Sequence, residues 1–401
     1  IGGRLRDGFG LTGKELNRHA DRDFAKAVQT RLQREGANPR QLGDLSKNLL
    51  NVTQQLRTDA RQENRQLNKS THFADVEVHK MSGPLRTLNR AVREMHLQSQ
   101  VGDFRDEHVT SRYQSIGAGA AHSVSKLTYD HVPQMKVYKG DDETIIHDGH
   151  HDMTLSGNYR FTAASRNGID STSPRLLERA VVTSKYADRL NFSVVAKTRY
   201  ASHNGKMGII QDLAPGKSAS TPGLLQKAMN ANKPEFQRQM AQLHLLDCLT
   251  GQGDRHRENY MVHVNGSNVS VTGIDSDYCM GPDIDDPNQL VRADGCHLPG
   301  MPNVVDQQMY DQIIGMSDND VRDLCDKSFS DATVDAAINR LHVMKQHLQT
   351  LHQNGHVIQP NQWGTPAADN LLDDVAGRDQ GLNQVAQRLT NDAPRLQQRF
   401  K

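Results

Sequence analysis

The sequence has few aromatic residues, few cysteines and no long apolar segment. Aromatic residues make up 5% of its 401 residues, and apolar residues make up 35%. No apolar run approaches the ~20 residues that span a bilayer, so we expect no transmembrane segment. The cysteines include no Cys-x-x-Cys pair, so neither a disulfide framework nor a zinc site is implied, and a reducing compartment is favoured. The four cysteines are Cys248, Cys279, Cys296 and Cys325.

The sequence also lacks an excess of charge of either sign. It carries 48 basic and 47 acidic residues, which gives a formal net charge of +1. This balance provides no overall attraction to nucleic acid or to an anionic membrane, so we expect no nucleic-acid partner. The chain begins with Ile1 rather than Met, which indicates a fragment or a processed form; a targeting segment upstream would not be visible.

Apolar residues at helical spacing are present through the first hundred residues. Pro39 stands where a first helical turn accepts proline. Leu42, Leu49 and Leu56 then follow on one stripe, which predicts a helix that buries one face. Similar patterns predict helices over most of residues 11–97.

The character of the chain changes near Tyr113. Residues 113–139 contain short β-prone runs separated by a Gly/Ala loop and by Asp130-His131-Val132-Pro133, which predicts a small sheet. Asn265-Gly266 is a strong two-residue turn signal between two later strands. The other predicted elements are a helix at 174–190, strands at 192–198 and 208–213, a helix at 234–249, a hairpin formed by 260–264 and 269–274, and helices from 306 to 353.

The strongest chemical pattern comes directly after the predicted 234–249 helix. It reads Gly251-Gln252-Gly253-Asp254-Arg255-His256-Arg257-Glu258-Asn259. Asp254 and Asn259 stand five residues apart, the interval between the catalytic Asp and the metal-ligating Asn of kinase loops. An Asp can accept the proton of an attacking hydroxyl, and an Asn carbonyl oxygen is a hard ligand suited to Mg²⁺. Arg255 and His256 are expected to support the loop or contact phosphate.

Two further carboxylates follow the predicted hairpin, in Gly273-Ile274-Asp275-Ser276-Asp277. A carboxylate at such a strand end, here Asp275, can join Mg²⁺ to the phosphates of a nucleotide. Ser276-Asp277 replaces the Phe-Gly that usually follows, so Asp277 is a candidate second metal ligand.

These motifs resemble a known catalytic core. Asp-Arg-His-x-x-Asn followed by Ile-Asp resembles the phosphatidylinositol 3- and 4-kinases. Val137-Tyr138-Lys139-Gly140-Asp141-Asp142 resembles the lysine strand of those enzymes, with one residue missing between Lys and Gly. The resemblance implies that Lys139 contacts the phosphates of ATP. Residues 246–252, Leu-Asp-Cys-Leu-Thr-Gly-Gln, also resemble kinase-like type III effectors secreted by bacterial pathogens.

Two other parts of a kinase site have candidates in the sequence. A phosphate-covering loop is predicted at residues 117–123, Gly-Ala-Gly-Ala-Ala-His-Ser, where Gly117, Gly119 and Ser123 would approach the nucleotide. It lacks the full Gly-x-Gly-x-x-Gly signature. Glu178, on the predicted 174–190 helix, is the candidate carboxylate that pairs with Lys139.

Plainer interpretations stand beside these. Lys136 is the alternative phosphate lysine; because Lys136 and Lys139 face opposite sides of one strand, only one can point into the cleft. The 254–259 segment is alternatively an ordinary charged loop. The histidine-rich stretch 147–152 is read as a solvated loop rather than a metal site, because its residues are packed too closely in sequence. Cys248 is read as core.

The patterns and the resemblance together predict an α+β, bilobal protein- or lipid-kinase-like fold. The predicted domains are a helical N-terminal region (1–109), a kinase-like catalytic domain (110–355), and a linker with a C-terminal helix (356–401). ATP and Mg²⁺ are the expected cofactors. The expected acceptor is a hydroxyl of a host protein, with a phosphoinositide as the alternative, because residues 279–300 contain only Arg292 as a fixed positive charge. The resemblance implies secretion by a bacterium into the host cytoplasm.

Two rival functions remain open at this stage. One is a kinase-fold enzyme that transfers AMP or an amino acid. The other is a pseudokinase that binds a host protein, against which the presence of Lys139, Asp254, Asn259 and Asp275 argues. The sequence does not determine the oligomeric state.

Overall fold

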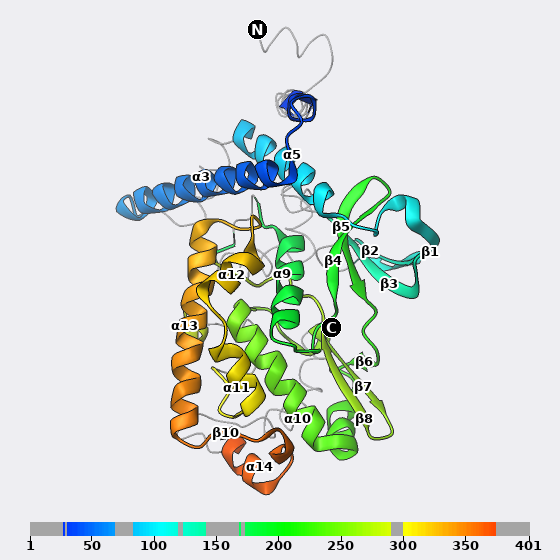
Figure 1. Cartoon of the computed structure of the whole chain (residues 1–401), viewed down its shortest axis with the longest axis vertical. Helices are drawn as coiled ribbons and strands as arrows, with labels where there is room; N and C mark the ends of the chain where they lie inside the picture. Colours follow the sequence, from blue (N-terminus) through cyan, green and yellow to red (C-terminus); the bar gives the residue numbers. More distant parts are fainter. Residues whose placement is uncertain are drawn as a thin grey trace.

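The protein is divided into a smaller lobe with an antiparallel sheet and a larger, mostly helical lobe (Figure 1). The computed structural model describes residues 27–28, 30–68, 83–118, 123–141, 168–169, 173–289 and 300–373. Helices α3 (Pro39–Gln66) and α5 (Gly83–Gln100) lie across one end of both lobes. The predicted α+β class with two lobes is confirmed.

The first long helix begins where the sequence predicts. The Asn38 side chain accepts a hydrogen bond from the backbone N–H of Gln41 at 2.9 Å, and the Gln41 side chain accepts one from the Asn38 N–H at 3.0 Å. Pro39 occupies the first turn, where its missing N–H costs nothing. This reciprocal cap satisfies two backbone donors and fixes the start of α3.

The small lobe is a five-stranded sheet in the order β1-β2-β3-β5-β4, with every pair antiparallel. Successive residues point to opposite faces of a strand, so Ile209 packs with one apolar cluster and Ile210 with the other. The strands are β1 (Val109–Ala118), β2 (Ser123–Tyr129), β3 (Val132–Gly140), β4 (Thr198–His203) and β5 (Lys206–Asp212), preceded by the short helix η1 (Asp106–His108).

The strand predicted at 192–198 is wrong for most of its length. Residues 192–197 form no strand, apart from an isolated bridge between Val195 and Gly273. Phe192 and Val194 are instead buried in the core of the large lobe. Their apolar character therefore reflects packing of the connection between the lobes, and β4 begins only at Thr198.

Helix α9 (Leu176–Arg189) connects the cores of both lobes. Leu177 and Val181 pack with Leu97 and other residues in the cluster beneath the sheet, and Tyr186 belongs to the core of the large lobe. Because Leu97 comes from α5, the N-terminal helices share a core with the sheet. The domain boundary predicted near residue 110 stays a prediction.

Helix α10 (Leu224–Thr250) starts earlier than predicted and is kinked. Asn232 departs from helical geometry (φ −160°, ψ 81°), and its side chain accepts a hydrogen bond from the Glu235 N–H at 3.2 Å. Asn232 therefore caps a second helical segment in which Pro234 occupies the first turn. The predicted start at Pro234 marks this kink rather than the beginning of the helix.

The predicted hairpin is present. Strands β7 (Tyr260–Asn265) and β8 (Asn268–Gly273) pair antiparallel, and Asn265 faces Asn268 across a two-residue turn that includes Gly266 at φ +58°. Strand β6 (Lys217–Ser218) adds a short edge.

The helical region predicted from residue 306 to 353 consists of the three helices α11 (Gln307–Ile314), α12 (Asp318–Cys325) and α13 (Asp331–Gln353).

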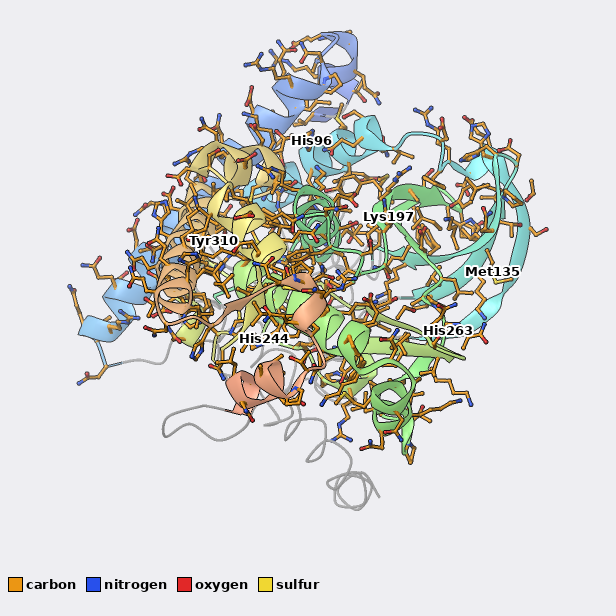
Figure 2. All side chains as sticks on the ribbon, turned by 60° about the horizontal axis from the view of Figure 1, so that its bottom comes forward. His96, Met135, Lys197, His244, His263 and Tyr310 are labelled. Atoms are coloured by element: carbon orange, nitrogen blue, oxygen red, sulfur yellow. The ribbon has the colours of Figure 1, made fainter. Side chains whose placement is uncertain are left out.

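In Figure 2, His244 on α10 and Tyr310 on α11 mark the large lobe, and Met135 on β3 lies at the rim of the sheet. No helix among the described residues is long and apolar enough to span a bilayer. The predicted C-terminal helix falls mostly on residues outside those described. The remaining elements are η2 (Arg257–Asn259), η3 (Pro287–Gln289), β9 (Val305–Asp306), α11 (Gln307–Ile314), α12 (Asp318–Cys325), α13 (Asp331–Gln353), β10 (Val357–Ile358), η4 (Pro360–Gln362) and α14 (Pro366–Asp373).

Candidate active site

The candidate catalytic loop follows directly from the end of α10. Gly251 has a φ of +66°, a left-handed conformation that glycine adopts without steric cost, and its backbone N–H caps the last turn. A Cβ at this position would lie 3.2–3.3 Å from the Arg340 guanidinium. The glycine therefore lets the chain leave the helix tightly against a buried side chain.

The loop brings Asp254 and Asn259 together. The Asn259 side-chain amide donates a hydrogen bond to the backbone carbonyl of Asp254 at 2.6 Å. This bond engages the –NH₂ group, so the amide oxygen of Asn259 is turned away from that carbonyl. Asn259 is buried, whereas Asp254 is only partly buried. The arrangement fixes the orientation of the Asn259 amide next to the Asp254 backbone.

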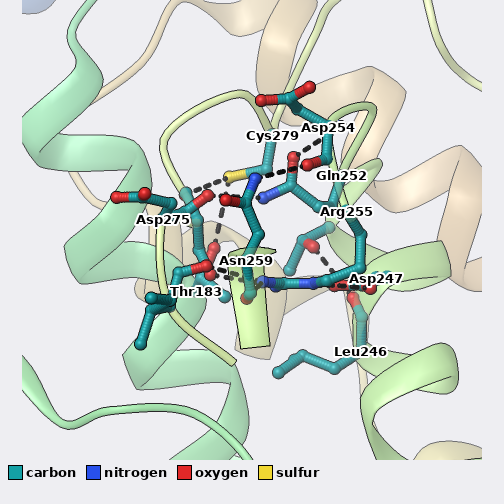
Figure 3. Close-up of polar contacts among 12 residues, drawn as sticks. Thr183, Leu246, Asp247, Gln252, Asp254, Arg255, Asn259, Asp275 and Cys279 are labelled. Carbon is teal, nitrogen blue, oxygen red and sulfur yellow. Dashed lines mark hydrogen bonds and ion pairs between the residues drawn. The ribbon is translucent and has the colours of Figure 1, made fainter. Parts of the chain in front are cut away.

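Arg255 connects the loop to its surroundings, as the sequence prediction of a supporting role allowed. Its guanidinium donates to both carboxylate oxygens of Asp247 on α10, with Nε–Oδ2 and Nη2–Oδ1 distances of 3.0 Å. The same group donates to the backbone carbonyls of Asn259 (2.5 Å) and Ile274 (2.6 Å) and to the Ser276 hydroxyl (3.1 Å). Figure 3 shows this convergence. The planar, buried guanidinium group of Arg255 therefore joins α10, the candidate catalytic loop and the end of the β7–β8 hairpin.

Gln252 makes a second connection between the two halves of the site. Its side-chain oxygen accepts from the Asp254 N–H at 3.0 Å, and its –NH₂ donates to the Asp275 carbonyl at 3.2 Å. The residue is fully buried. A backbone bond from the Ile274 N–H to the Asn259 carbonyl (2.9 Å) reinforces the same junction. Asp254, Asn259 and Asp275 are therefore held next to one another.

Asp275 lies in a left-handed backbone conformation, with φ +54°. Asp tolerates this region better than most residues, and such conformations are concentrated at functional sites. Its carboxylate forms an ion pair with the Lys139 ammonium, which reaches across from β3. Lys139 is 8% exposed. The structure thus brings the predicted lysine and the predicted metal carboxylate into direct contact.

Lys136, the alternative phosphate lysine, lies elsewhere. It pairs with Asp212 on β5 at 2.7 Å. The two lysines therefore have different carboxylate partners, as expected for opposite faces of one strand, and Lys139 is the one that meets the loop residues.

The predicted ion pair between Glu178 and Lys139 is not present. Glu178, on the first turn of α9, is 1% exposed and receives two hydrogen bonds from Arg93 of α5, at 2.6 Å (Nε–Oε1) and 2.7 Å (Nη2–Oε2). Arg93 also bonds Asp141 at 2.7 Å. Because Arg93 occupies both carboxylate oxygens, Lys139 pairs with Asp275 instead.

Electrostatics support the Arg93–Glu178 pair. Burial alone would raise the pKa of Glu178, but the neighbouring Arg93 guanidinium outweighs burial, and the pKa lies below its usual value of 4.5. The carboxylate is therefore ionised in the folded protein at neutral pH.

Two other predicted residues occupy supporting or adjacent positions. His256 caps the short helix η2, where its Nδ1 accepts a hydrogen bond from the Glu258 N–H at 3.2 Å. Asp277 is buried two residues beyond Asp275. Its role as a second metal ligand stays a prediction.

The predicted phosphate-covering loop begins at the end of β1 and ends at the start of β2, and its residues 119–122 lie outside the described ones. Gly117 pairs with Val124, and Ala118 pairs with Ser123, at the end of this hairpin. Gly119 lies outside the described residues. The hairpin also leads through β2 into β3, the strand that carries Lys139. The histidine-rich stretch 147–152 lies outside the described residues as well.

Buried arginines hold the segment after Asp277. Arg179 of α9 donates to the carbonyls of Cys279 (2.5 Å) and Met280 (2.7 Å). Arg340 of α13 donates to the Leu249 carbonyl at 3.0 Å and also bonds the carbonyl of Ile284. These donors satisfy carbonyls that no secondary structure pairs. The backbone around the site is therefore fixed from two helices.

Sequence reasoning missed Arg93, Gln252, Asp247 and Arg340. Asp247 did carry a signal, because a lone carboxylate within the apolar helix run Leu245-Leu246-Asp247-Cys248-Leu249 indicates a buried ion pair. Arg93 carried none, since its partner Glu178 lies 85 positions away.

The donor set at the loop fits the group that the motifs imply. The carboxylate oxygens of Asp275 and the amide oxygen of Asn259 are the hard ligands that Mg²⁺ prefers. In Figure 3 the Asn259 amide lies between the Asp254 and Asp275 segments. The Asp275 side chain is 44% exposed, so it is accessible to a ligand.

Comparisons with known proteins give distant structural likenesses only. No family model matches the chain, and no curated protein matches it. Among solved structures, the Helicobacter pylori proinflammatory kinase CtkA is similar, with 12% identity, 63% of this chain and 97% of that chain covered, and a TM-score of 0.40. A Mycobacterium tuberculosis PknI kinase domain (double mutant) has 11% identity, coverage of 71% and 96%, and a TM-score of 0.27.

Proposed function

We propose that this protein is an ATP- and Mg²⁺-dependent phosphotransferase. The single observation that carries the proposal is the meeting of Lys139 from the sheet lobe with Asp275, next to Asn259 and Asp254 of the loop. Phosphoryl transfer requires positioning and charge stabilisation, and these four side chains supply a cation, hard oxygen ligands and a proton acceptor.

Each residue has a role that its position supports. Lys139 releases Asp275 when a nucleotide binds and holds phosphate oxygens instead. Asp254, partly exposed at the start of the loop, orients the acceptor hydroxyl and accepts its proton. Asn259 and Asp275 hold Mg²⁺, and Asp277 is the candidate additional ligand. When bound, Mg²⁺ neutralises charge on the transferred phosphate.

The surrounding residues keep this geometry rigid. Arg255 and Gln252 fix the loop against the end of the hairpin, so the distance between the proton acceptor and the metal ligands does not depend on mobile side chains. Gly117 and Ser123, at the turn of the β1–β2 hairpin, belong to the segment that would cover the phosphates. Such preorganisation is the main contribution that a protein makes to phosphoryl transfer.

For the acceptor, we propose a hydroxyl group of a host protein, with the chain acting as a secreted bacterial effector. The support is limited to the sequence: the resemblance of residues 246–252 to such effectors, and a segment after Asp275 with few positive charges for an anionic lipid. A phosphoinositide is the alternative acceptor.

The test is phosphate transfer from γ-labelled ATP by purified protein, supplied with host lysate in one arm and phosphoinositide vesicles in another. Asp254→Ala and Asp275→Ala should each abolish transfer while the thermal unfolding profile remains cooperative. Asp212→Asn, which changes an exposed carboxylate paired with Lys136, is the matched control and should keep full activity.

The outcomes separate the rival functions. If either Asp254→Ala or Asp275→Ala keeps full transfer, the role of that residue is wrong. A mass increase on the substrate that corresponds to AMP would show nucleotidyl transfer. Binding of ATP and Mg²⁺, detected by thermal shift without any turnover, would identify a pseudokinase.

A further inference from the structure

A compact group of two imidazoles and one carboxylate lies away from the candidate active site. His108 ends the short helix η1, and Asp130-His131 forms the turn between β2 and β3. One ligand atom from each of the three side chains lies within 4.8 Å of the others. Within the described part of the chain, this is the one group of three such residues that meets this distance.

The backbone holds these residues in place before any ligand binds. The Asp130 N–H donates to the His108 carbonyl at 2.9 Å, which ties the turn to the entry of β1. On either side of the turn, Tyr129 pairs with Val109 and with Val132. The three residues therefore lie at a helix end and in a tight turn that paired strands anchor on both sides, which is more rigid than a free loop.

The Asp130 carboxylate lies between the two imidazole rings. The two oxygens of Asp130 face two different rings, with Oδ2 at 3.0 Å from His108 Nδ1 and Oδ1 at 2.8 Å from His131 Nδ1. Imidazole nitrogen and carboxylate oxygen are both ordinary ligands of Zn²⁺. The side chains are 36%, 51% and 32% exposed, so an ion can enter and water can complete a four-coordinate shell.

Neighbouring residues fix the orientation of the rings. His131 packs against the rings of Phe104 and Tyr129, with centroids 5.3 and 5.8 Å away. Glu107 lies on the other side of His108, with its Oε1 3.8 Å from Nε2. This distance is too long for a hydrogen bond, so Glu107 adds negative charge near the ring without fixing its orientation.

We propose that His108, Asp130 and His131 form a Zn²⁺ site that fastens the β2–β3 turn to the start of β1. In it, the ion takes the place of the protons that now bridge the carboxylate and the rings. The site covers the cluster of Phe104, Tyr129 and their neighbours on the outer face of the sheet. With three protein ligands the site keeps one coordination position open to water, and it does not depend on phosphoryl transfer.

The test uses the full chain, stripped of metal with a chelator, and ZnCl₂ alone as the probe. Mg²⁺ in excess occupies hard oxygen sites during the titration. Calorimetry should detect a site of about micromolar affinity or tighter that weakens at least tenfold in His108→Ala, in His131→Ala and in Asp130→Asn. Co²⁺ in place of Zn²⁺ should give the visible absorption of a four-coordinate ion, and this absorption should vanish in the same variants.

Two controls separate this site from other histidines. His342→Ala removes an exposed histidine that pairs with Asp318 but has no second imidazole partner, and it should bind Zn²⁺ as the unmodified chain does. Replacement of His147, His150 and His151 together by Ala should also leave the site intact. Unchanged affinity in both His108→Ala and His131→Ala would overturn the proposal and leave the group as a hydrogen-bonded surface cluster. Loss of the Co²⁺ signal only in the 147–151 variant would overturn it too.

Discussion

Arg93 binds both carboxylate oxygens of Glu178, although the two residues belong to different parts of the chain. The Nε–Oε1 and Nη2–Oε2 distances are 2.6 and 2.7 Å, and the side chains are 5% and 1% exposed. A buried carboxylate on α9, the helix that packs against β4 and β5, is thus held by the N-terminal helix α5. The carboxylate partner of Lys139 is Asp275, which follows the β7–β8 hairpin.

Removal of only one member of the Arg93–Glu178 pair should lower the stability of the protein strongly. Arg93→Met leaves Glu178 charged and buried, so the free energy of unfolding should fall by about 3–5 kcal/mol. Chemical denaturation measures this loss. In Arg93→Met/Glu178→Met the buried carboxylate is removed as well, so part of the stability should return; the return is incomplete because buried Arg175, whose Nη1 lies 3.6 Å from Glu178 Oε1, loses its carboxylate partner. An exposed pair is the control: Arg31→Met, which breaks the contact with Glu35, should produce no measurable loss. If the double variant is no more stable than Arg93→Met, the loss in Arg93→Met does not come from the charge left on buried Glu178.

The same pair predicts how stability depends on pH. The pKa of Glu178 is lower in the folded protein than its usual value of 4.5 because of Arg93, so ionised Glu178 stabilises the fold above that value. This contribution is lost as the pH falls below about 4.5 and through the lower folded pKa. The difference in unfolding free energy between the unmodified chain and Glu178→Gln should therefore be greatest at neutral pH and narrow on acidification. Denaturation series at several pH values measure it. A difference independent of pH would contradict this assignment.

Lys139 should control nucleotide binding and transfer. Lys139→Met removes the cation that meets Asp275, so kcat/KM for ATP should fall by about 100-fold or more. Steady-state kinetics measure the effect. Lys136→Met, on the same strand but paired with Asp212, is the matched control and should keep its activity. Equal losses in the two variants would show that Lys139 has no special role.

Arg255 should tolerate no conservative replacement. Lys keeps the charge, but it cannot reproduce the planar fork that joins Asp247 to the carbonyls of Asn259 and Ile274. We expect Arg255→Lys to lower the free energy of unfolding by about 2 kcal/mol or more. Transfer should slow by about 100-fold even where the variant is folded, because the loop residues shift.

The control for Arg255 is Arg238→Lys. Arg238 binds Glu235 through a similar fork but is less buried and lies far along α10 from the loop. The Arg238→Lys variant should keep both the rate of phosphate transfer and the free energy of unfolding nearly unchanged. If Arg255→Lys behaves like this control, the bracing role is wrong.

Much of the fold was predictable because local signals were strong. The Asn38-Pro39 cap, the Asn265-Gly266 turn and the turn signal Asp130-His131-Val132-Pro133 before β3 each act over a few residues. The kink at Asn232 was not predictable in the same way, because the helical pattern before Pro234 is weak. Apolar residues at 192–197 were read as a strand, since burial between lobes and burial in a sheet give the same pattern.

In the candidate site, too, the residues of short local motifs were predictable, whereas long-range partners were not. Asp254, Asn259, Asp275 and Lys139 were predictable as candidates because their spacing within short motifs is set by local geometry, and the structure brings them together. The partner of Glu178 was not, because its choice between Lys139 and Arg93 depends on how α5 packs against α9. Such long-range choices between two cations leave no trace in a short motif.

Helices α3 and α5 pack against each other, yet they are fastened to different lobes. Lys47 and Asn51 of α3 bind Asp331 at the start of α13, whereas α5 packs against β4 and β5 and its Arg93 binds Glu178 of α9. The pair of N-terminal helices therefore links the two lobes. Loss of the Lys47–Asp331 or the Arg93–Glu178 contact should for this reason change how firmly Lys139 is held next to Asp275.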